Sequence, residues 1–223
     1  MAQSLRPSVA PNLPIGPVDY DQRYQDQLLN ALRLYFRELD NFTQVLMANS
    51  GGRFISFPHI SASDTTDQYA TADNTPTLVL WNTLETNEGF TLNAPGTATA
   101  AYSGVYKIDY SLQFANTDNA AHDVVIWLRV DGVDVPRSAS KFTLPARKSA
   151  GVYSYLVAYS HITFPIYGGS DIELYWATDK GYNSVGPVDG VYMEYESAQT
   201  APYAHPAIPS AIGTITFVSE LPQ

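Results

Sequence analysis

The sequence predicts a mainly β protein: an antiparallel sandwich preceded by one N-terminal α-helix and an extended proline-rich arm. Apolar residues recur every seven positions over residues 19–46 and every two positions further along the chain. The later strands are short, separated by turns, and free of any helical pattern, which is typical of an antiparallel sandwich. We therefore divide the chain into an arm (1–18), a helix with its stop (19–52) and a β-domain (53–223).

The arm, residues 1–18, contains Pro7, Pro11, Pro14 and Pro17. Proline at this density favours an extended polyproline-like path, which forms no internal hydrogen bonds and buries little of itself. We expect such an arm to be held by another subunit or by a larger assembly, and so to serve as an anchor. An arm folded back on its own domain is the alternative. The segment lacks the charged and apolar blocks of a signal peptide.

The helix carries a heptad seam. Its residues are spaced by alternating steps of four and three, and they are Leu28, Leu32, Tyr35, Leu39, Phe42 and Leu46. Because one helix offers this seam no helical partner in its own chain, we expect the partner to be another copy. Leu29 and Phe36 widen the stripe, which favours three copies or packing on a host surface. A helix lying on its own β-domain stays open as an alternative.

Capping residues set the expected ends of this helix. Asp19 with Gln22 forms a candidate N-cap and capping-box pair. The four residues 49–52, Asn-Ser-Gly-Gly, supply a stop in which glycine can adopt the left-handed conformation.

The β-domain shows its clearest strand at residues 106–114, where five apolar residues alternate with Lys107, Asp109, Ser111 and Gln113. The further predicted strands cover residues 53–57, 78–82, 124–130, 152–159, 162–164, 172–176, 190–195 and 214–218. Turn signals such as Asp131-Gly132 and Gly168-Gly169 separate several of them.

Composition excludes several classes of function. The chain of 223 residues has a formal net charge of −10 and a pI near 4.6, which argues against nucleic acid as a partner. No cysteine occurs, so disulfides, thiol catalysis and cysteine-ligated zinc are excluded. No apolar run approaches the roughly 20 residues that a membrane span needs.

Residues with catalytic or metal-binding chemistry are scattered. The histidines lie in separate segments without metal-ligand spacing, and they are His59, His122, His161 and His205. Glu194 and Glu196 alternate on one predicted strand and have the chemistry of a glycosidase acid and base, although outward charges on a sheet explain them equally well. Acidic residues near 64–73 and 116–123 suit calcium but lack the spacing of a dedicated loop. We therefore predict no catalytic residue, no metal ligand, no cofactor and no enzymatic activity.

Sixteen tyrosines are more informative than the acids. Tyr153, Tyr155 and Tyr159 fall on one face of a predicted strand, and we predict that they form the contact between subunits of a trimer. Further tyrosines, at 182, 192 and 195, cluster near the late strands. A glycan-contacting surface and ordinary sandwich packing are the alternatives.

At four places the sequence resembles the tumour-necrosis-factor-like jelly roll that is shared with complement globular heads. The matching segments are LVLWNT at 78–83, TNEGF at 86–90, SGVY at 103–106 and DIELYWATDK at 171–180. The resemblance covers roughly residues 53–223. It implies a compact ten-stranded jelly roll that trimerises about a three-fold axis and binds other molecules without catalysing a reaction.

A second resemblance concerns the helix. The run LNALRLYFRELDNF at residues 29–42 is similar to N-terminal anchors of small structural proteins in marine tailed bacteriophages. The two resemblances together imply a virion fibre or capsid decoration protein, assembled in the bacterial host cytoplasm. The implied partners are other copies in a homotrimer, capsid or tail proteins contacted through residues 1–48, and a host-surface glycan. Attachment to head or tail stays open, and the alternatives are a free glycan-binding adhesin or lectin and a polysaccharide hydrolase.

Overall fold

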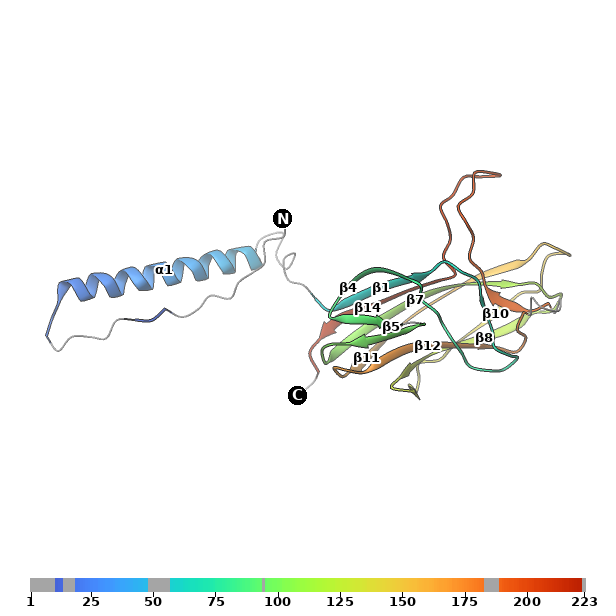
Figure 1. Cartoon of the computed structure of the whole chain (residues 1–223), viewed down its shortest axis with the longest axis horizontal. Coiled ribbons are helices and arrows are strands. Elements are labelled where there is room, and N and C mark those ends of the chain that lie inside the picture. Colours follow the sequence, from blue (N-terminus) through green and yellow to red (C-terminus); the bar gives the residue numbers. More distant parts are fainter. Residues whose placement is uncertain (1–10, 14–18, 48–56, 94, 183–188, 222–223) are drawn as a thin grey trace. The chain divides into compact units, whose positions relative to one another are not determined.

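The computed structural model describes residues 11–13, 19–47, 57–93, 95–182 and 189–221, and for residues 44–47 it describes the backbone alone. The chain divides into two compact units, Met1–Ser56 and Phe57–Gln223 (Figure 1).

The first unit contains one helix, α1 (Gln22–Met47). The amide of Arg23 donates to Oδ1 of Asp21 at 2.8 Å, and the amide of Gln25 donates to the Asp21 carbonyl at 3.1 Å. Asp21 is therefore the N-cap, and the prediction of Asp19 as the cap is wrong: only Asp21 lies within reach of the second helical amide. The predicted stop at residues 49–52 lies outside the described residues.

The second unit is built from two antiparallel sheets. Sheet A consists of β1 (His59–Asp64), β2 (Gln68–Tyr69), β4 (Thr83–Glu88), β7 (Gly104–Asn116), β11 (Ser154–Ile166), β13 (Val191–Met193) and β14 (Ala211–Ser219). Sheet B consists of β3 (Thr77–Leu78), β5 (Phe90–Asn93), β6 (Thr97–Ala100), β8 (His122–Val130), β9 (Val133–Asp134), β10 (Ser140–Leu144) and β12 (Asp171–Thr178).

Strand pairing identifies the sandwich as a jelly roll. Four nested pairs run from the outside of the sequence inward: β1 with β14, β6 with β12, β7 with β11, and β8 with β10. This is the order produced when one long hairpin is wound into two facing sheets. The prediction of a mainly β, antiparallel jelly roll preceded by one helix is confirmed.

The core lies between the sheets and follows the alternation of β7. Tyr106, Tyr110 and Phe114 are buried from that strand, and the Phe114 ring lies 5.4 Å from the ring of Trp176 on β12. The polar residues between them point to the outer face of sheet A. The predicted half-buried strand at residues 106–114 is confirmed.

Several strand predictions need correction. Residues 79–82 form no strand, because the side chain of Gln68 takes the place of a neighbouring strand: it accepts from the Leu80 amide at 2.8 Å and donates to the Leu80 carbonyl at 3.2 Å. The strands predicted at 152–159 and 162–164 are one strand, β11, paired with β7 along its whole length. In the strand predicted at 53–57, only Phe57 is described, and it precedes β1.

Candidate functional site

The outer face of sheet A exposes an apolar band. Alternate residues of β11 point away from the core, so Tyr155, Val157 and Tyr159 are 53%, 52% and 57% exposed. Ile212 on β14 joins them, because Ile212, Ser111 and Tyr159 are register partners on three adjacent strands. We call Tyr155, Val157, Tyr159 and Ile212 the apolar band.

A row of tyrosines extends this band across the sheet. Tyr69 pairs with Tyr192, Tyr192 with Ala115, and Ala115 with Tyr155, so all four side chains share one face. The rings of Tyr69 and Tyr192 are stacked at 5.6 Å, and Tyr182 lies 5.1 Å from Tyr192. Tyr192 is almost fully covered by these neighbours, whereas Tyr155 at the end of the row stays open to solvent.

Polar residues bound the band on the side toward the start of β7. The Tyr159 hydroxyl donates to Asp109 at 3.1 Å, and Lys107 forms a 2.8 Å ion pair with the same carboxylate. The outer face of sheet A is therefore divided: its aromatic part lies near Tyr155 and its charged part near Lys107. A partner that buries the aromatic part meets a polar rim, as expected of a protein interface.

The predicted interface tyrosines have different positions. Tyr155 and Tyr159 project from the same outer face of β11, but Tyr153 precedes the strand and is half-buried. Of the other predicted tyrosines, Tyr182 joins the stacked row with Tyr69 and Tyr192. Tyr195 contributes its backbone amide, which donates to Asp67 at 2.9 Å.

Acidic side chains border the tyrosine row. The Tyr192 hydroxyl donates to Glu194 at 2.7 Å, and the Tyr69 hydroxyl donates to Asp67 at 3.1 Å. Burial, with the Asp67 carboxylate second, raises the pKa of Tyr69 to about 12. Burial also raises the pKa of Glu194, and the negative charges of Asp67 and Glu196 raise it further.

Replacing Glu194 with glutamine should stabilise the fold at neutral pH. A carboxyl whose pKa is raised by folding favours the folded state fully below its ordinary pKa, and this contribution is lost as pH rises through the raised value. Glutamine removes the charge and keeps an acceptor for Tyr192. We expect Glu194→Gln to gain about 0.5 kcal/mol at pH 7, a value reduced for partial exposure, and much less at pH 4. Urea unfolding at both pH values checks this, and a loss of stability at pH 7 would contradict the assigned cause.

Glu194 and Glu196 do not lie on a strand as predicted, because β13 ends at Met193. Each carboxylate has its own partners: Glu194 accepts from Tyr192, whereas Glu196 accepts from Gln199 and lies 3.6 Å from Nε2 of His205. These contacts give both acids a role in holding the chain after β13.

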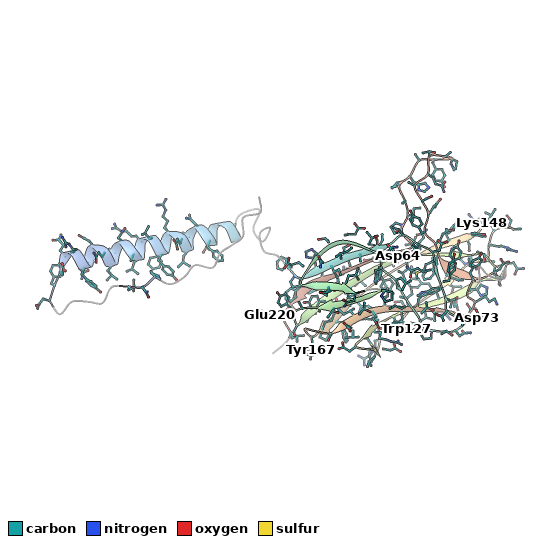
Figure 2. The ribbon with its side chains drawn as sticks, in the orientation of Figure 1. Asp64, Asp73, Trp127, Lys148, Tyr167 and Glu220 are labelled. Atoms are coloured by element: carbon teal, nitrogen blue, oxygen red, sulfur yellow. The ribbon has the colours of Figure 1, made fainter. Side chains whose placement is uncertain are left out.

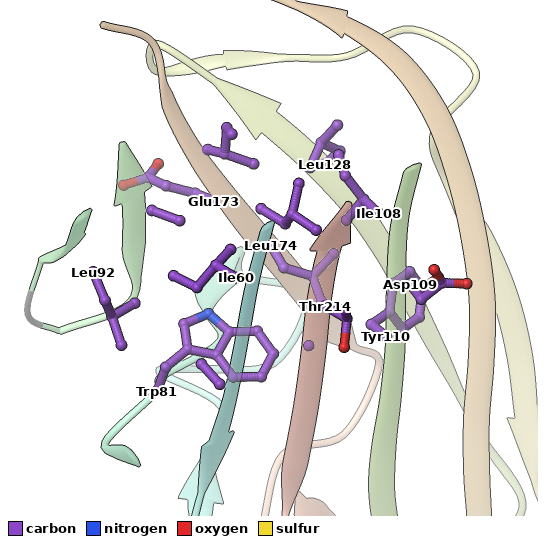
Figure 3. Close-up of a pocket in the computed structure, with 15 residues that line it drawn as sticks. Ile60, Trp81, Leu92, Ile108, Asp109, Tyr110, Leu128, Glu173, Leu174 and Thr214 are labelled. Atoms are coloured by element: carbon purple, nitrogen blue, oxygen red, sulfur yellow. The ribbon is translucent and has the colours of Figure 1, made fainter. Parts of the chain in front are cut away.

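A small apolar cavity lies between the sheets (Figure 3). Its volume is about 40 Å³, and Ile60, Trp81, Leu92 and Leu174 are among the residues around it. Binding pockets for small molecules typically measure 300–1,000 Å³, so this space is a packing gap of a few water volumes.

His122 ties two loops of the sandwich together. Its Nε2 lies 3.0 Å from Asp118 and its Nδ1 lies 3.2 Å from Asp179. The predicted acidic loops at 64–73 and 116–123 bring no three metal-binding side chains together within the described ranges. Asp118 is instead the partner of His122. The side-chain amide of Asn116 donates to the carbonyls of Ala120 and Pro145 at 2.9 Å each.

Fold stability should fall as pH rises through the titration of His122. Burial, the largest effect, opposes the charged form, but Asp118 and Asp179 together outweigh it and raise the pKa of His122. A histidine with a raised pKa contributes fully below its ordinary value of roughly 6.5, and loses this contribution as pH passes the raised value. We expect a decline in stability, of about 1 kcal/mol at most, as pH rises above roughly 6.5. His122→Gln should abolish it, and His161→Gln, an exposed control on β11, should not. Urea titrations at several pH values provide the measurement.

The predicted helix seam and arm belong to the first unit. Leu28, Leu32, Tyr35, Leu39 and Phe42 are half-buried on α1. The flanking residues Leu29, Leu34 and Phe36 are 47%, 56% and 58% exposed. The side chain of Leu46 lies outside the described residues, as do Pro7, Pro14 and Pro17, whereas Pro11 is described and half-buried. Within the described ranges, α1 is not apolar enough to cross a membrane.

Comparison with known proteins finds similarity to solved structures. No protein-family model and no curated protein matches the chain. Among solved structures, the chain is similar to that of Eiger TNF from S. frugiperda. The two are 10% identical, the match covers 75% of this chain and 96% of that chain, and the TM-score is 0.46.

Proposed function

We propose that this chain is a non-enzymatic structural protein of a bacteriophage particle. It forms a homotrimer, attaches to the particle by its N-terminal arm, and displays the jelly-roll domain as a knob for adhesion or particle stabilisation. The observation that carries the proposal is the apolar band on the outer face of sheet A.

The band supports self-association on grounds of area and charge. Four large apolar side chains that share one exposed face mark an interaction surface more strongly than scattered ones do. Copies of a chain with a net charge of −10 repel one another, so they associate best through surfaces with few acids. The four side chains of the band carry no charge, and two acids at its border are engaged within the chain: Asp109 is paired with Lys107, and Glu194 accepts from Tyr192.

The helix supports the same assembly from the other unit. Most helical stability in proteins comes from packing of the apolar face, so the 26 residues of α1 gain most of their stability when the seam is covered. A seam of period seven packs against other helices with the same period, and a second copy of the chain supplies one. Three copies would give each seam two neighbours.

Attachment to a particle rests on the arm and on the resemblance of residues 29–42 to phage anchors. Capsid or tail proteins are the proposed partners of residues 1–48. A chain without internal hydrogen bonds gains order by laying its backbone on a partner, and four prolines pre-extend this arm for such a role.

Deletion of residues 1–18 tests the anchor. The truncated protein should remain a folded, soluble trimer, because α1 and the apolar band are intact, but it should no longer join particles. Particles assembled with tagged truncated or tagged full-length chain, purified on a density gradient and immunoblotted, provide the comparison. Normal incorporation of the truncated chain would remove the anchor from the proposal.

A free glycan-binding adhesin is the second candidate, and one observation favours it. Trp127 and Tyr175 are stacked at 6.0 Å on neighbouring strands of sheet B, and Arg129 lies 3.9 Å from the centre of the Tyr175 ring. Flat aromatic faces with polar neighbours suit the stacking of sugar rings. Glycan binding that survives deletion of residues 1–18 and is lost in Trp127→Ala would favour this candidate.

A further inference from the structure

A finger of chain rises from the middle of sheet A. It consists of residues 194–210, which connect β13 to β14. The Glu194 amide donates to the Gln113 carbonyl at 2.9 Å, and the Gln113 amide donates to the Ser210 carbonyl at 2.8 Å. The chain therefore leaves the sheet and returns to it at one residue of β7, and the finger stands within the sheet instead of at a strand end.

The base of the finger is firmly held. The Tyr195 amide donates to Asp67 at 2.9 Å on one side, and the Ser210 amide donates to the Asp64 carbonyl at 3.0 Å on the other. Above the base, Glu196 and Ile208 exchange two backbone hydrogen bonds of 3.0 and 2.8 Å, and Gln199 and His205 exchange two of 3.1 Å. The finger is thus a preformed ribbon and needs little further ordering to bind.

The tip of the finger is open. Residues 200–204 are all exposed, and Tyr203 is 73% exposed with its ring 6.0 Å from that of His205. Figure 1 shows the finger rising on the side of β1 and β14, away from β8 and β12. A protruding aromatic tip on a rigid base is a feature of interaction surfaces, where tyrosine is enriched.

The finger stands beside the apolar band. The pKa of the Tyr155 hydroxyl is raised, first by burial and then by the negative charges of Glu194 and Glu196 at the base of the finger. Ile212 follows the finger by two residues and lies on the same outer face. Any molecule that covers the band therefore meets the finger.

Charge narrows the identity of that molecule. Residues 197–219 contain no aspartate, glutamate, lysine or arginine, although the whole chain carries a net charge of −10. A basic partner would be recognised through acids, whereas a second acidic copy is tolerated only where acids are missing. Beyond its base, where Glu194 and Glu196 lie, the finger carries no carboxylate, lysine or arginine side chain, and neither do the four residues of the band. This is the region of the surface that a second acidic copy can approach.

Length gives the geometry of the contact. The eight residues from Glu196 to Tyr203 reach at most about 25 Å when extended, and two packed sheets lie about 10 Å apart. A copy seated on the band would therefore be overlapped by the finger. Each finger would contact a different surface on the next chain, so the contact is heterologous. Such contacts close into a ring when the rotation that relates one chain to the next permits it.

We propose that the finger clasps a neighbouring copy of the chain, with Tyr203 at its tip packed on that copy. This inference rests on the proposed homotrimer and adds the element that joins one subunit to the next.

Single-cysteine cross-linking tests the clasp, because the chain has no cysteine of its own. Tyr203→Cys is labelled with a benzophenone maleimide and irradiated in the full-length protein. Tyr167→Cys is the matched control: this tyrosine is 65% exposed in the turn between β11 and β12, away from the finger (Figure 2). We expect cross-linked dimers and trimers from position 203 and only background from position 167. When ¹⁵N-labelled and unlabelled copies are mixed, the cross-linked peptides should join one ¹⁴N and one ¹⁵N chain, which identifies the contact as one between two copies.

A substitution at the same position provides a second test of the clasp. Tyr203→Ala should weaken trimer association at least tenfold, and Tyr167→Ala should leave it unchanged, as measured by sedimentation. A wild-type trimer that gives no cross-link at position 203 and no weakening in Tyr203→Ala overturns the clasp and leaves the homotrimer standing. Cross-links that form only when particles are added overturn it in favour of another virion protein. A wild-type monomer overturns both the clasp and the homotrimer.

Discussion

Tyr155→Asp should convert the trimer into monomers. The side chain is half exposed on β11, the edge strand of sheet A that pairs with β7, and it lies next to the base of the finger. The change removes about 1–2 kcal/mol of apolar burial per contact, and it places a new carboxylate beside Glu194 and Glu196, where desolvation and repulsion add to the loss. A loss of at least ~3 kcal/mol per contact weakens association more than 100-fold. Light scattering at micromolar concentration measures the change.

The control for this variant is Tyr167→Asp. It introduces the same charge at another exposed tyrosine, which lies off the proposed contact. It should stay trimeric. A Tyr155→Asp protein with unchanged mass would show that the apolar band does not join the subunits.

Leu32→Asp combined with Leu39→Asp should abolish the helical assembly. Each leucine contributes about 1.5–3 kcal/mol when it is buried in a seam, and both are half-buried on α1. Because most helical stability in proteins comes from packing of the apolar face, we expect the loss of association to be accompanied by a loss of helical signal at 222 nm. Circular dichroism at matched concentrations measures it.

Leu34→Asp is the matched control for the seam. Leu34 lies on the same helix, is 56% exposed and stands outside the heptad pattern. It should keep both the helical signal and the trimer. Equal behaviour of the seam variant and this control would show that the heptad pattern does not bind another copy.

The sequence predicts best those strands in which apolar and polar residues alternate strictly. In β7, five apolar residues face the core and polar residues face out, so the pattern determines both the strand and its faces. Two of the missed strands have weak patterns: β1 reads HISASD, in which Ile60 is the one large apolar residue, and β6 reads TATA. Such strands form because the register with β14 and β12 supplies their hydrogen bonds, and this register is a long-range property.

The outer face of sheet A was predictable only in part. The shared face of Tyr155 and Tyr159 follows from the alternation of side chains along one strand. Val157, which lies between them at the same two-residue spacing, must share that face. Ile212 and Tyr69 join the face through pairing with β7 and β13, which no local pattern encodes. The finger is also a consequence of register, because both of its ends meet Gln113.

The N-cap of α1 shows how precisely sequence alone can place the end of a helix. Asp19 and Asp21 both precede the helix, and both have the chemistry of an N-cap. Their difference lies in the hydrogen bond from the Arg23 amide, which only the Asp21 carboxylate accepts. Sequence patterns place helix ends to within a few residues, and backbone geometry selects the residue.

The mass of the full-length chain in solution tests self-association most directly. Sedimentation or light scattering across a range of concentrations should give three times the 24.5 kDa of one chain. A constant mass of 24.5 kDa up to high micromolar concentration would contradict the trimer, and the apolar band and the helix seam would then need another explanation.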